Sequence, residues 1–403
     1  MNNLYLILLS LFISTLISCN KEPVETIEKL PISVEKTNST KVYVHYMPWF
    51  ETKEFSGKWG FHWTMNNQNP DLFDGEGNRK IASHYYPLIG TYDSEDPDLV
   101  EYHLLLMKYS GIDGVLIDWY GSFNVADYGL NLKNSNSLIF ETPKYALDFG
   151  IVYEEFTTEK SSIRFQISEI EAAVKDLEYI ENNYLTMDNY IFFKDRPLLL
   201  TFGPRYIRSK TKWSTIFESV ETEFSFLPLW NFTNLVGSEN SVGEYAWIDF
   251  SSDSSLLKSF YSNNMKENII GSVFPGFHDF YKEGGVGESY GYLSHANGTR
   301  LDTNLELINT YNLSHVQLVT WNDFGEGTIL EPTAEFEYKY LEKIQKFTGV
   351  KYGVDDLKLI TKLYGLRKLH KTNNSIQEQL DIISEHLRSL ETDLARKKIN
   401  SIN

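Results

Sequence analysis

The chain has 403 residues, of which 42% are hydrophobic and 15% aromatic, so it is long enough to bury a large core. Its net charge is −18, and residues 351–403 hold 10 Lys or Arg against 7 Asp or Glu, which leaves 27 basic and 48 acidic residues before them. So acidic a body repels phosphate and argues against nucleic acid as a partner. The single cysteine excludes a disulfide framework and a thiolate metal site. The nine histidines show no metal-ligand spacing, and neither a Gly-x-Ser-x-Gly elbow nor a phosphate-binding loop is present, so we expect no cofactor.

An apolar run from Leu4 to Ile17 opens the chain. It is too short for a typical membrane span and has the length of a signal-peptide core. The sequence Leu-Ile-Ser-Cys at residues 16–19, which closes this run, fits a lipobox. We therefore predict a lipoprotein signal peptide over residues 1–18, a diacylated Cys19 and a polar tether over residues 19–40. Such an anchor places the protein in a bacterial cell envelope, and we expect the outer membrane. The alternative is an ordinary signal peptide with an incidental cysteine.

Short apolar runs alternate with helix-like stretches between residues 41 and 350. The runs with the length and composition of strands are Val42–Tyr46, Gly114–Trp119, Gly150–Tyr153, Pro197–Phe202, Phe226–Trp230, Ala246–Phe250, Ile269–Phe274 and Val316–Trp321. The stretches that predict helices are Pro97–Ser110, Ser161–Tyr184, Lys212–Glu223, Ser254–Asn263 and Leu301–Tyr311. Eight strand-then-helix units in one body predict an α/β fold of the (β/α)8 TIM barrel type.

The expected strands end in aromatic and acidic residues, where structural strands would end in small turn residues. Because the C-terminal ends of barrel strands carry the active site, these side chains should line one pocket. Aromatic faces that stack on the apolar side of a sugar, together with carboxylates that bind its hydroxyls, are typical of a glycan cleft. The predicted substrate-binding residues are Trp49, Trp119, Tyr120, Glu154, Trp321 and Asn322. For Glu154 the alternative is an ion pair at the barrel mouth.

The segment at residues 320–327, after the last strand, reads Thr-Trp-Asn-Asp-Phe-Gly-Glu-Gly. Hydrolysis of a glycosidic bond needs an acid and a second carboxylate. Asp323 and Glu326 stand three residues apart here, and the neighbouring glycines allow a sharp backbone path. We predict that both residues are catalytic and that burial and the charge of Asp323 raise the pKa of Glu326. Taken alone, such a pair can also cap the following helix.

The stretch Trp321–Thr333 resembles the catalytic segment of glycoside hydrolase family 99, the endo-α-mannosidases and endo-α-1,2-mannanases. It is equally similar to that of family 71, the α-1,3-glucanases. Further similar segments follow one another in order at residues 90–97, 103, 111–121 and 273–277. The resemblance therefore covers the body from Val42 to about Phe347 and leaves the C-terminal tail outside.

The resemblance implies a (β/α)8 barrel, two catalytic carboxylates after its last strand, and an oligo- or polysaccharide substrate, with α-mannan or an α-mannoside favoured. It implies the role of general acid/base for Glu326 and a substrate contact for Tyr46. Family 99 has Glu at the position of Asp323, where it is thought to deprotonate the sugar's 2-hydroxyl. The shorter Asp323 is similar to family 71, whose segment is linked to inversion. An inverting α-1,3-glucanase-like enzyme and a non-catalytic glycan-binding lipoprotein are therefore the alternatives.

Residues 351–403 predict a helical extension. Leu357, Ile360 and Leu363 share one face of its first helix. A second helix is expected to begin with the capping-box pattern at residues 375–378. Its apolar seam consists of Ile376, Leu380, Ile383, Leu387, Leu390 and Leu394. We favour a helical hairpin packed on the barrel or on itself, and the alternative is weak self-association through a short coiled coil.

Overall fold

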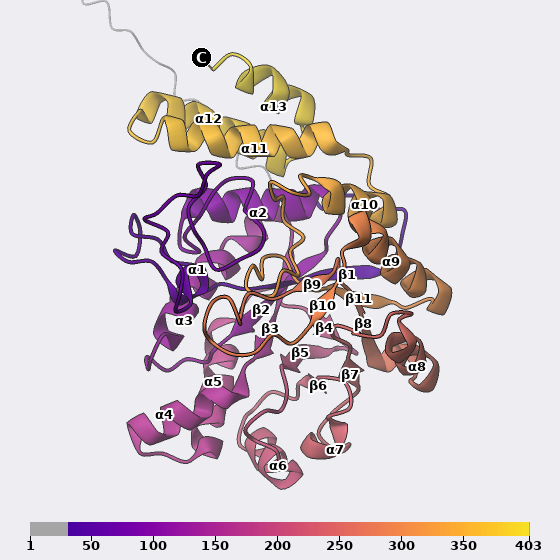
Figure 1. The fold of residues 1–403 in the computed structure, drawn as a ribbon. Helices are drawn as coiled ribbons and strands as arrows, with labels where there is room; N and C mark the ends of the chain where they lie inside the picture. The colour runs from indigo at the N-terminus through magenta and orange to yellow at the C-terminus, as the bar shows by residue number, and fades with distance from the viewer. Residues whose placement is uncertain (1–30, 403) are drawn as a thin grey trace, which may run out of the picture.

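The computed structural model describes residues 31–402, and parallel strands lie at their centre (Figure 1). The pairing of these strands closes into a ring. In ring order the strands are β1 (Lys41–Tyr46), β2 (Gly114–Trp119), β3 (Asp148–Tyr153), β5 (Arg196–Thr201), β6 (Ser225–Pro228), β7 (Glu244–Tyr245), β8 (Ile269–Val273) and β11 (His315–Leu318). Neighbouring strands pair in parallel, and β11 returns to β1. Between β6 and β7 the link is a single bridge, Leu229 to Tyr245. The predicted (β/α)8 barrel is confirmed.

The strand predictions differ from the structure at one position. Seven predicted runs overlap barrel strands, but the run Ala246–Phe250 follows β7 and lies outside any strand. Two short additions complete the sheets: β4 (Phe192–Phe193) runs antiparallel to β5, and β9 (Phe277–His278) pairs antiparallel with β10 (Tyr292–Leu293).

Helices cover the outside of the ring, as Figure 1 shows. They are α2 (Pro97–Tyr109), α3 (Tyr128–Ile139), α4 (Thr158–Phe165), α5 (Glu169–Asn183), α6 (Lys210–Glu218), α7 (Thr233–Val236), α8 (Ser255–Asn263), α9 (Thr299–Tyr311) and α10 (Lys339–Thr348). The first begins where Asp96 accepts a hydrogen bond from the Asp98 amide at 3.0 Å, with proline at the first helical position. The helix predicted over Ser161–Tyr184 is two helices, because Gln166 is left-handed at φ 57° and Ser168 caps α5.

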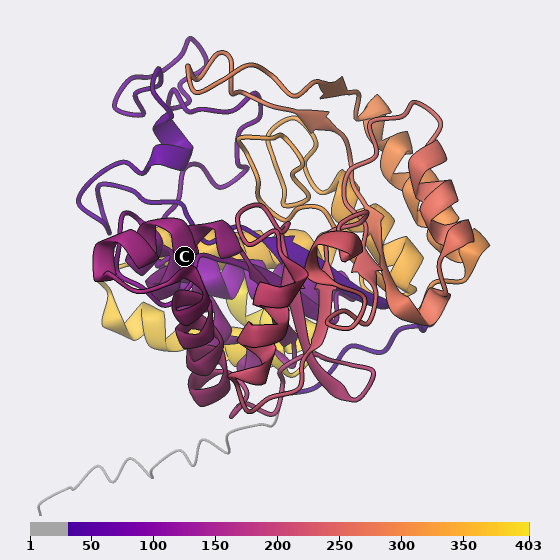
Figure 2. The ribbon, with the colours of Figure 1, turned by 90° about the horizontal axis from the view of Figure 1, so that it is seen from below.

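The long segment between β1 and α2 contains only one short helix, α1 (Phe61–Thr64). It meets the β8–β10 region across the mouth of the barrel (Figure 2). The Asn66 amide donates to the Gly284 carbonyl at 2.9 Å, and the Asn67 side chain donates to the Glu283 carbonyl at 2.8 Å. Two regions more than 200 residues apart are thereby joined over the C-terminal ends of the strands.

Three helices form the C-terminal extension: α11 (Val354–Leu369), α12 (Asn374–Arg388) and α13 (Thr392–Ile399). The predicted capping box is wrong, because the residue that caps α12 is Asn373, two residues before Ser375. The Asn373 side chain accepts a hydrogen bond from the Ile376 amide at 3.3 Å. The predicted continuous seam is also wrong. The helix ends at Arg388, Leu390 adopts φ 60°, and Leu394 is 47% exposed on α13.

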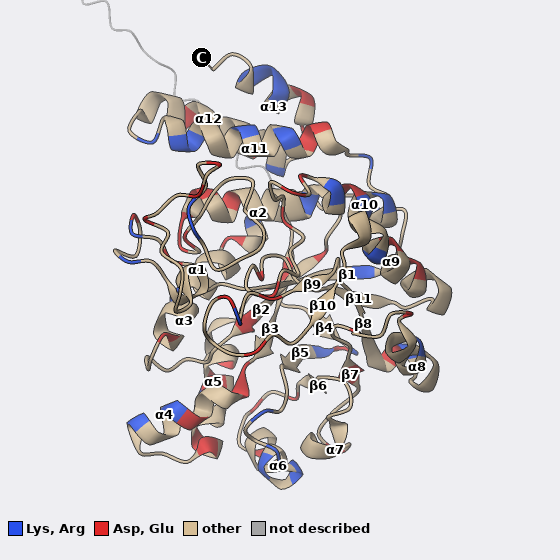
Figure 3. Cartoon of the chain, in the orientation of Figure 1, with Lys and Arg blue, Asp and Glu red and all other residues tan. Residues whose placement is uncertain are grey.

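The rest of the seam packs within the chain. Leu380, Ile383 and Leu387 are fully buried, and the Tyr109 hydroxyl of α2 donates to the Leu387 carbonyl at 3.0 Å. These side chains are therefore already covered within the chain, chiefly by α11 and α13, which agrees with the favoured packed helices rather than with a free coiled-coil seam. Figure 3 shows the basic residues that recur along this extension, in contrast to the acidic body.

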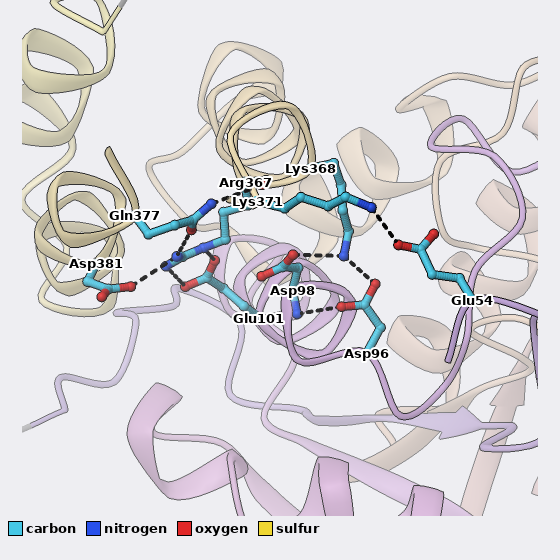
Figure 4. Close-up of polar contacts among 9 residues, drawn as sticks. All are labelled: Glu54, Asp96, Asp98, Glu101, Arg367, Lys368, Lys371, Gln377 and Asp381. Carbon is cyan, nitrogen blue, oxygen red and sulfur yellow. Dashed lines mark hydrogen bonds and ion pairs between the residues drawn. The ribbon is translucent and has the colours of Figure 1, made fainter. Parts of the chain in front are cut away.

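Ion pairs fasten α11 to α2 and to the segment after β1 (Figure 4). Arg367 binds Glu101 through Nε at 2.5 Å and Nη2 at 2.9 Å, and its Nη1 lies 2.9 Å from Asp381 of α12. Lys368 contacts Asp96 and lies 2.7 Å from Asp98. Because Arg367 and Glu101 are both nearly buried, this bidentate pair fixes the orientation of the two helices.

The predicted signal peptide and Cys19 lie outside the described residues. The described end of the predicted tether runs along the barrel, where Lys108 contacts the Ile32 carbonyl and the Asn38 amide donates to the Thr348 carbonyl at 3.1 Å. Within residues 31–402 no helix has the length and apolar character that crossing a bilayer requires.

Candidate active site

A cavity of about 420 Å³ opens at the C-terminal ends of the barrel strands. Its polar wall is built from His45 on β1, Asp118 on β2, Glu154 after β3, Arg205 after β5, and Asp323 and Glu326 after β11. Its apolar wall is largely aromatic and includes Trp49, His62, Tyr120, Phe156, Phe202, Trp247, Phe250, Phe277, Tyr281 and Tyr290. The predicted residues Trp49, Tyr120, Glu154, Asp323 and Glu326 thus share one cavity.

Short hydrogen bonds hold the segment that carries Asp323 and Glu326. The Asp323 amide donates to the Thr320 hydroxyl at 2.8 Å, and the Glu326 amide donates to Asp323 Oδ1 at 2.9 Å. The Glu326 carbonyl accepts from the His278 amide of β9 at 2.8 Å. Gly327 adopts φ 66°, and a Cβ there would lie 2.7 Å from the His278 carbonyl. The turn therefore requires glycine, as expected from the sequence, and it packs directly against β9.

The environment of Glu326 favours a proton on its carboxyl near neutral pH. Burial raises its pKa to about 7, and the charges of Asp279 and Asp118 act in the same direction. The Tyr281 hydroxyl donates to Glu326 Oε1 at 2.9 Å and, with the charge of Arg205, lowers the pKa. The predicted rise in the pKa of Glu326 is thus found, with burial as its main cause. The sequence analysis named the charge of Asp323, whereas the charges that raise this pKa most are those of Asp279 and Asp118.

Asp323 lies in the same acidic environment. Burial raises its pKa well above the usual range, and the charge of Glu326 is the second cause. Backbone hydrogen bonds from Glu326 and Gly325 oppose this rise because they stabilise the ionised carboxylate. We assign the ionised form to Asp323 and the proton to Glu326, since Asp323 accepts fixed amide donors and Glu326 accepts a single hydroxyl.

A second acidic pair on the polar wall consists of Asp118 on β2 and Glu154 after β3. Burial raises the pKa of Glu154 well above its usual range, the charge of Asp118 adds to this, and Arg205 opposes it. Arg205 Nη1 lies 3.6 Å from Glu154 Oε2. Asp118 Oδ2 and Glu154 Oε2 have no hydrogen-bond partner among the described residues. Glu154 therefore lines the cavity and also forms the alternative ion pair at its mouth, and its contact with a substrate stays a prediction.

Aromatic rings form flat surfaces beside these carboxylates. Trp49 stacks on His62 with ring centres 3.9 Å apart and an angle of 6° between the planes. Trp247 meets His45 edge-on at 4.9 Å, and the Arg205 guanidinium lies 4.9 Å from the centre of the Phe156 ring. Rings combined with carboxylates and one guanidinium are suited to bind the apolar face and the hydroxyl rim of a sugar.

Two predicted residues on strands point away from the cavity. Tyr46 is buried against α2, with its hydroxyl 3.2 Å from His103 Nδ1. Trp119 is fully buried between the barrel and α5, where it packs on Tyr153 and Tyr179. Their predicted contact with a substrate is therefore wrong. Successive strand residues face opposite sides, so their neighbours His45 and Asp118 line the cavity instead.

Trp321 and Asn322 also lie behind the cavity wall. Trp321 is fully buried with its ring 5.4 Å from that of His103. Asn322 accepts from the Met47 amide at 2.9 Å and donates to the Met47 carbonyl at 3.0 Å. Both residues join the segment that carries Asp323 and Glu326 to β1 and α2, and their predicted contact with a substrate is corrected to this supporting position.

Several cavity residues were absent from the sequence prediction. His45 and Asp118 could have been found by strand alternation, because each precedes a residue that was chosen. Arg205, Trp247 and Tyr281 lie on loops whose direction no local pattern gives. Within residues 31–402 no group of three or more His, Cys, Asp or Glu side chains is placed to hold a metal ion.

The model of glycosyl hydrolase family 99 matches residues 37–226 of this chain. Among curated proteins, the glycoprotein endo-alpha-1,2-mannosidase of Mus musculus is 22% identical over 202 residues, which is 46% of this chain and 41% of that protein. The Rattus norvegicus protein of the same name is 27% identical over 100 residues, 22% of this chain and 21% of that protein. The matched region thus spans less than half the length of these relatives.

Solved structures extend the likeness over the barrel. The GH99 endo-alpha-mannosidase from Bacteroides thetaiotaomicron is 19% identical, with a TM-score of 0.59, and the match covers 80% of this chain and 99% of that chain. A glycoside hydrolase-like protein gives a TM-score of 0.55 at 12% identity, covering 79% of this chain and 96% of the other. These matches agree with the resemblance predicted from the motifs: the family 99 model matches the first half of the barrel, and the solved structures have the same fold.

Proposed function

We propose that the chain is a glycosidase that hydrolyses α-linked glycans, with an α-mannan or an α-mannoside as substrate. The observation that carries the proposal is the pair Asp323 and Glu326, held by one tight turn in an aromatic cavity at the barrel mouth. The relatives named above, two of which are endo-alpha-1,2-mannosidases, support the reaction class and the sugar.

In the proposed reaction Glu326 is the general acid. Its pKa of about 7 keeps a proton available near neutral pH, and that proton passes to the leaving glycosidic oxygen as the bond to the anomeric carbon breaks. Asp323 is the second carboxylate and removes a proton from the attacking nucleophile. Trp49 and Tyr120 bind the apolar face of the sugar, and Glu154 with Arg205 binds its hydroxyls.

The test uses the purified mature protein with α-mannan and, separately, α-1,3-glucan as substrate. We expect release of reducing ends from α-mannan, and a loss of at least about a hundredfold in Glu326→Gln and in Asp323→Asn. Turnover of α-1,3-glucan alone would favour the α-1,3-glucanase-like alternative. Binding of either glycan without turnover, unchanged in Glu326→Gln, would contradict catalysis and favour a glycan-binding protein.

The nucleophile on which Asp323 acts can be identified from the stereochemistry of the product. Proton NMR of the first-formed anomer reports inversion if Asp323 activates water, and retention if it activates the 2-hydroxyl of the sugar. The shorter side chain of Asp323, compared with the Glu of family 99, favours water because it leaves more room beside the anomeric carbon. We therefore expect the inverted product, and a retained product would refute the assignment to water.

We also propose that Cys19 anchors the enzyme to the outer membrane of a bacterial envelope. The proposal is supported by the lipobox and by the cysteine's being the only one in the chain. Replacement of Cys19 by Ser should release the protein from the membrane fraction and abolish labelling by a fatty-acid analogue. Unchanged fractionation of Cys19→Ser would indicate an ordinary signal peptide.

A further inference from the structure

A second cleft lies between the C-terminal extension and the segment that follows β1. Its volume is about 690 Å³, larger than the 420 Å³ of the catalytic cavity. One wall is formed by residues 52–55, Trp59 and residues 88–93, and the other by one face of α11 that includes Tyr364, Gly365 and Lys368. The same β1–α2 segment contributes Trp49 and His62 to the catalytic cavity, so it separates the two hollows.

The two walls are held at a fixed spacing. Lys371 lies 3.0 Å from Glu54, and Lys368 contacts Asp96 and Asp98 (Figure 4). These pairs join α11 to the segment after β1 and to the start of α2. The cleft is therefore already formed before any ligand enters it, which reduces the entropy lost on binding.

The charges that line the cleft are largely used in contacts within the protein. Besides the pairs just named, Lys53 contacts Asp71. Arg79 donates to the Pro70 carbonyl at 2.7 Å and lies over the Trp59 ring at 5.1 Å. Asp93 accepts from the Thr52 amide at 2.7 Å. No excess of either sign is left for a charged ligand, so this lining is suited to a neutral, hydroxyl-rich one.

Aromatic side chains supply the apolar part of the lining. Phe55 is 44% exposed and Trp59 is partly exposed. Lys368 Nζ lies 5.4 Å from the centre of the Phe55 ring and 5.3 Å from that of Tyr364, so a ligand would meet the edges and the remaining faces of these rings. Aromatic rings framed by planar polar groups are the combination that binds the C–H face and the hydroxyl rim of a sugar.

Gly365 marks the middle of the α11 wall. Glycine inside a helix costs about 1 kcal/mol relative to alanine. A Cβ at Gly365 would meet no heavy atom within 4 Å, so helix packing does not require the glycine. A larger side chain there would project into the cleft. The helix thus contains a residue that weakens it at the position where the absence of a side chain keeps the cleft open.

From these observations we propose that the cleft is a second glycan-binding site, which holds a neutral polysaccharide chain while the catalytic cavity acts on it. The proposal deepens the proposed function and rests on it for the identity of the glycan. The site increases affinity for polymeric substrate and has no effect on a short oligosaccharide that fills the catalytic cavity alone.

The test fills the cleft by Gly365→Trp and uses Gly365→Ala as the matched control. Both changes favour the helix, and only the tryptophan occupies the cleft. In the Glu326→Gln background, affinity electrophoresis in gels containing α-mannan or α-1,3-glucan measures binding without turnover. We expect Gly365→Ala to be retained by at least one polysaccharide and Gly365→Trp to bind it about tenfold more weakly. In the active protein, KM for that polysaccharide rises by a similar factor and kcat/KM for a tetrasaccharide stays unchanged.

Two outcomes overturn the cleft as a glycan site. In the first, both variants are retained equally; in the second, neither variant is retained by either polysaccharide. A parallel loss of tetrasaccharide turnover in Gly365→Trp also overturns it, because the change would then act through the catalytic cavity. If the active protein turns over no glycan but Gly365→Trp still weakens retention, the proposed function fails and the second site stands. Thermal unfolding of each variant checks that α11 remains folded.

Discussion

Replacing Tyr281 with Phe removes one hydroxyl group and keeps the ring in the cavity wall. That hydroxyl donates to Glu326 Oε1 at 2.9 Å and stabilises the ionised carboxylate, so its loss raises the pKa of Glu326 above the value of about 7. A hydrogen bond to a charged group contributes about 1.5–3 kcal/mol, part of which the neutral carboxyl also receives. A net difference of about 1.4 kcal/mol corresponds to one pKa unit.

The assay is the pH dependence of kcat/KM on a mannooligosaccharide, which reports ionisations of the free enzyme. Since Glu326 must carry a proton to act as acid, activity in the parent falls as the pH rises through about 7. In Tyr281→Phe this alkaline limb moves up by about one unit. The control is Tyr290→Phe, because Tyr290 also lines the cavity and packs edge-on against Tyr281 at 5.3 Å. An alkaline limb that stays in place or moves down in Tyr281→Phe refutes the assignment of Glu326 as the acid held by Tyr281.

Two further predictions separate binding from folding. Trp49→Ala should raise KM several-fold with little change in stability. Trp119→Ala should cost about 3–5 kcal/mol of stability, measured by urea unfolding, and leave KM of the folded protein unchanged. The reverse pattern would show that the assignment of these two residues to cavity and core is mistaken. Glu331 receives a hydrogen bond from Tyr92 at 2.5 Å and lies 2.9 Å from His103, all three being buried. Glu331→Leu should lower the free energy of unfolding by about 3–5 kcal/mol because His103 loses its buried partner, and Glu331→Gln should lower it clearly less. Equal losses in the two variants would count against the pairing of His103 with Glu331.

The sequence was informative where the pattern is local. Apolar runs bounded by turn residues located seven of the eight barrel strands, and the glycines at 325 and 327 indicated the turn that holds Asp323 and Glu326. The run Ala246–Phe250 was misplaced because β7 is only two residues long and provides almost no period-two signal. In the extension, the spacing of leucines continued through the break at Leu390, since hydrophobic spacing carries no information about a left-handed residue.

The residues of the site were harder to predict because facing and loop direction decide them. The family resemblance suggested Tyr46, and the aromatic strand end suggested Trp119. The barrel interior takes the other alternation, with His45 and Asp118. Arg205 reaches the cavity from a loop after β5, where the amides of residues 205–207 bind the buried Glu155 carboxylate. That contact joins residues about 50 positions apart, so no window along the chain could indicate it.

The pairing of α11 with α2 has a consequence for how the protein is made. Glu101 and Arg367 are separated by 266 residues, and Tyr109 and the Leu387 carbonyl by 278. At the usual pace of translation, about 5–20 residues per second, Glu101 is synthesised roughly 13–53 seconds before Arg367. During that interval the outer face of α2, including Glu101 and Tyr102, has no covering helix. The nascent chain therefore exposes this face of α2 until α11 and α12 emerge, and truncation before Val354 leaves the face permanently open to water and to proteases.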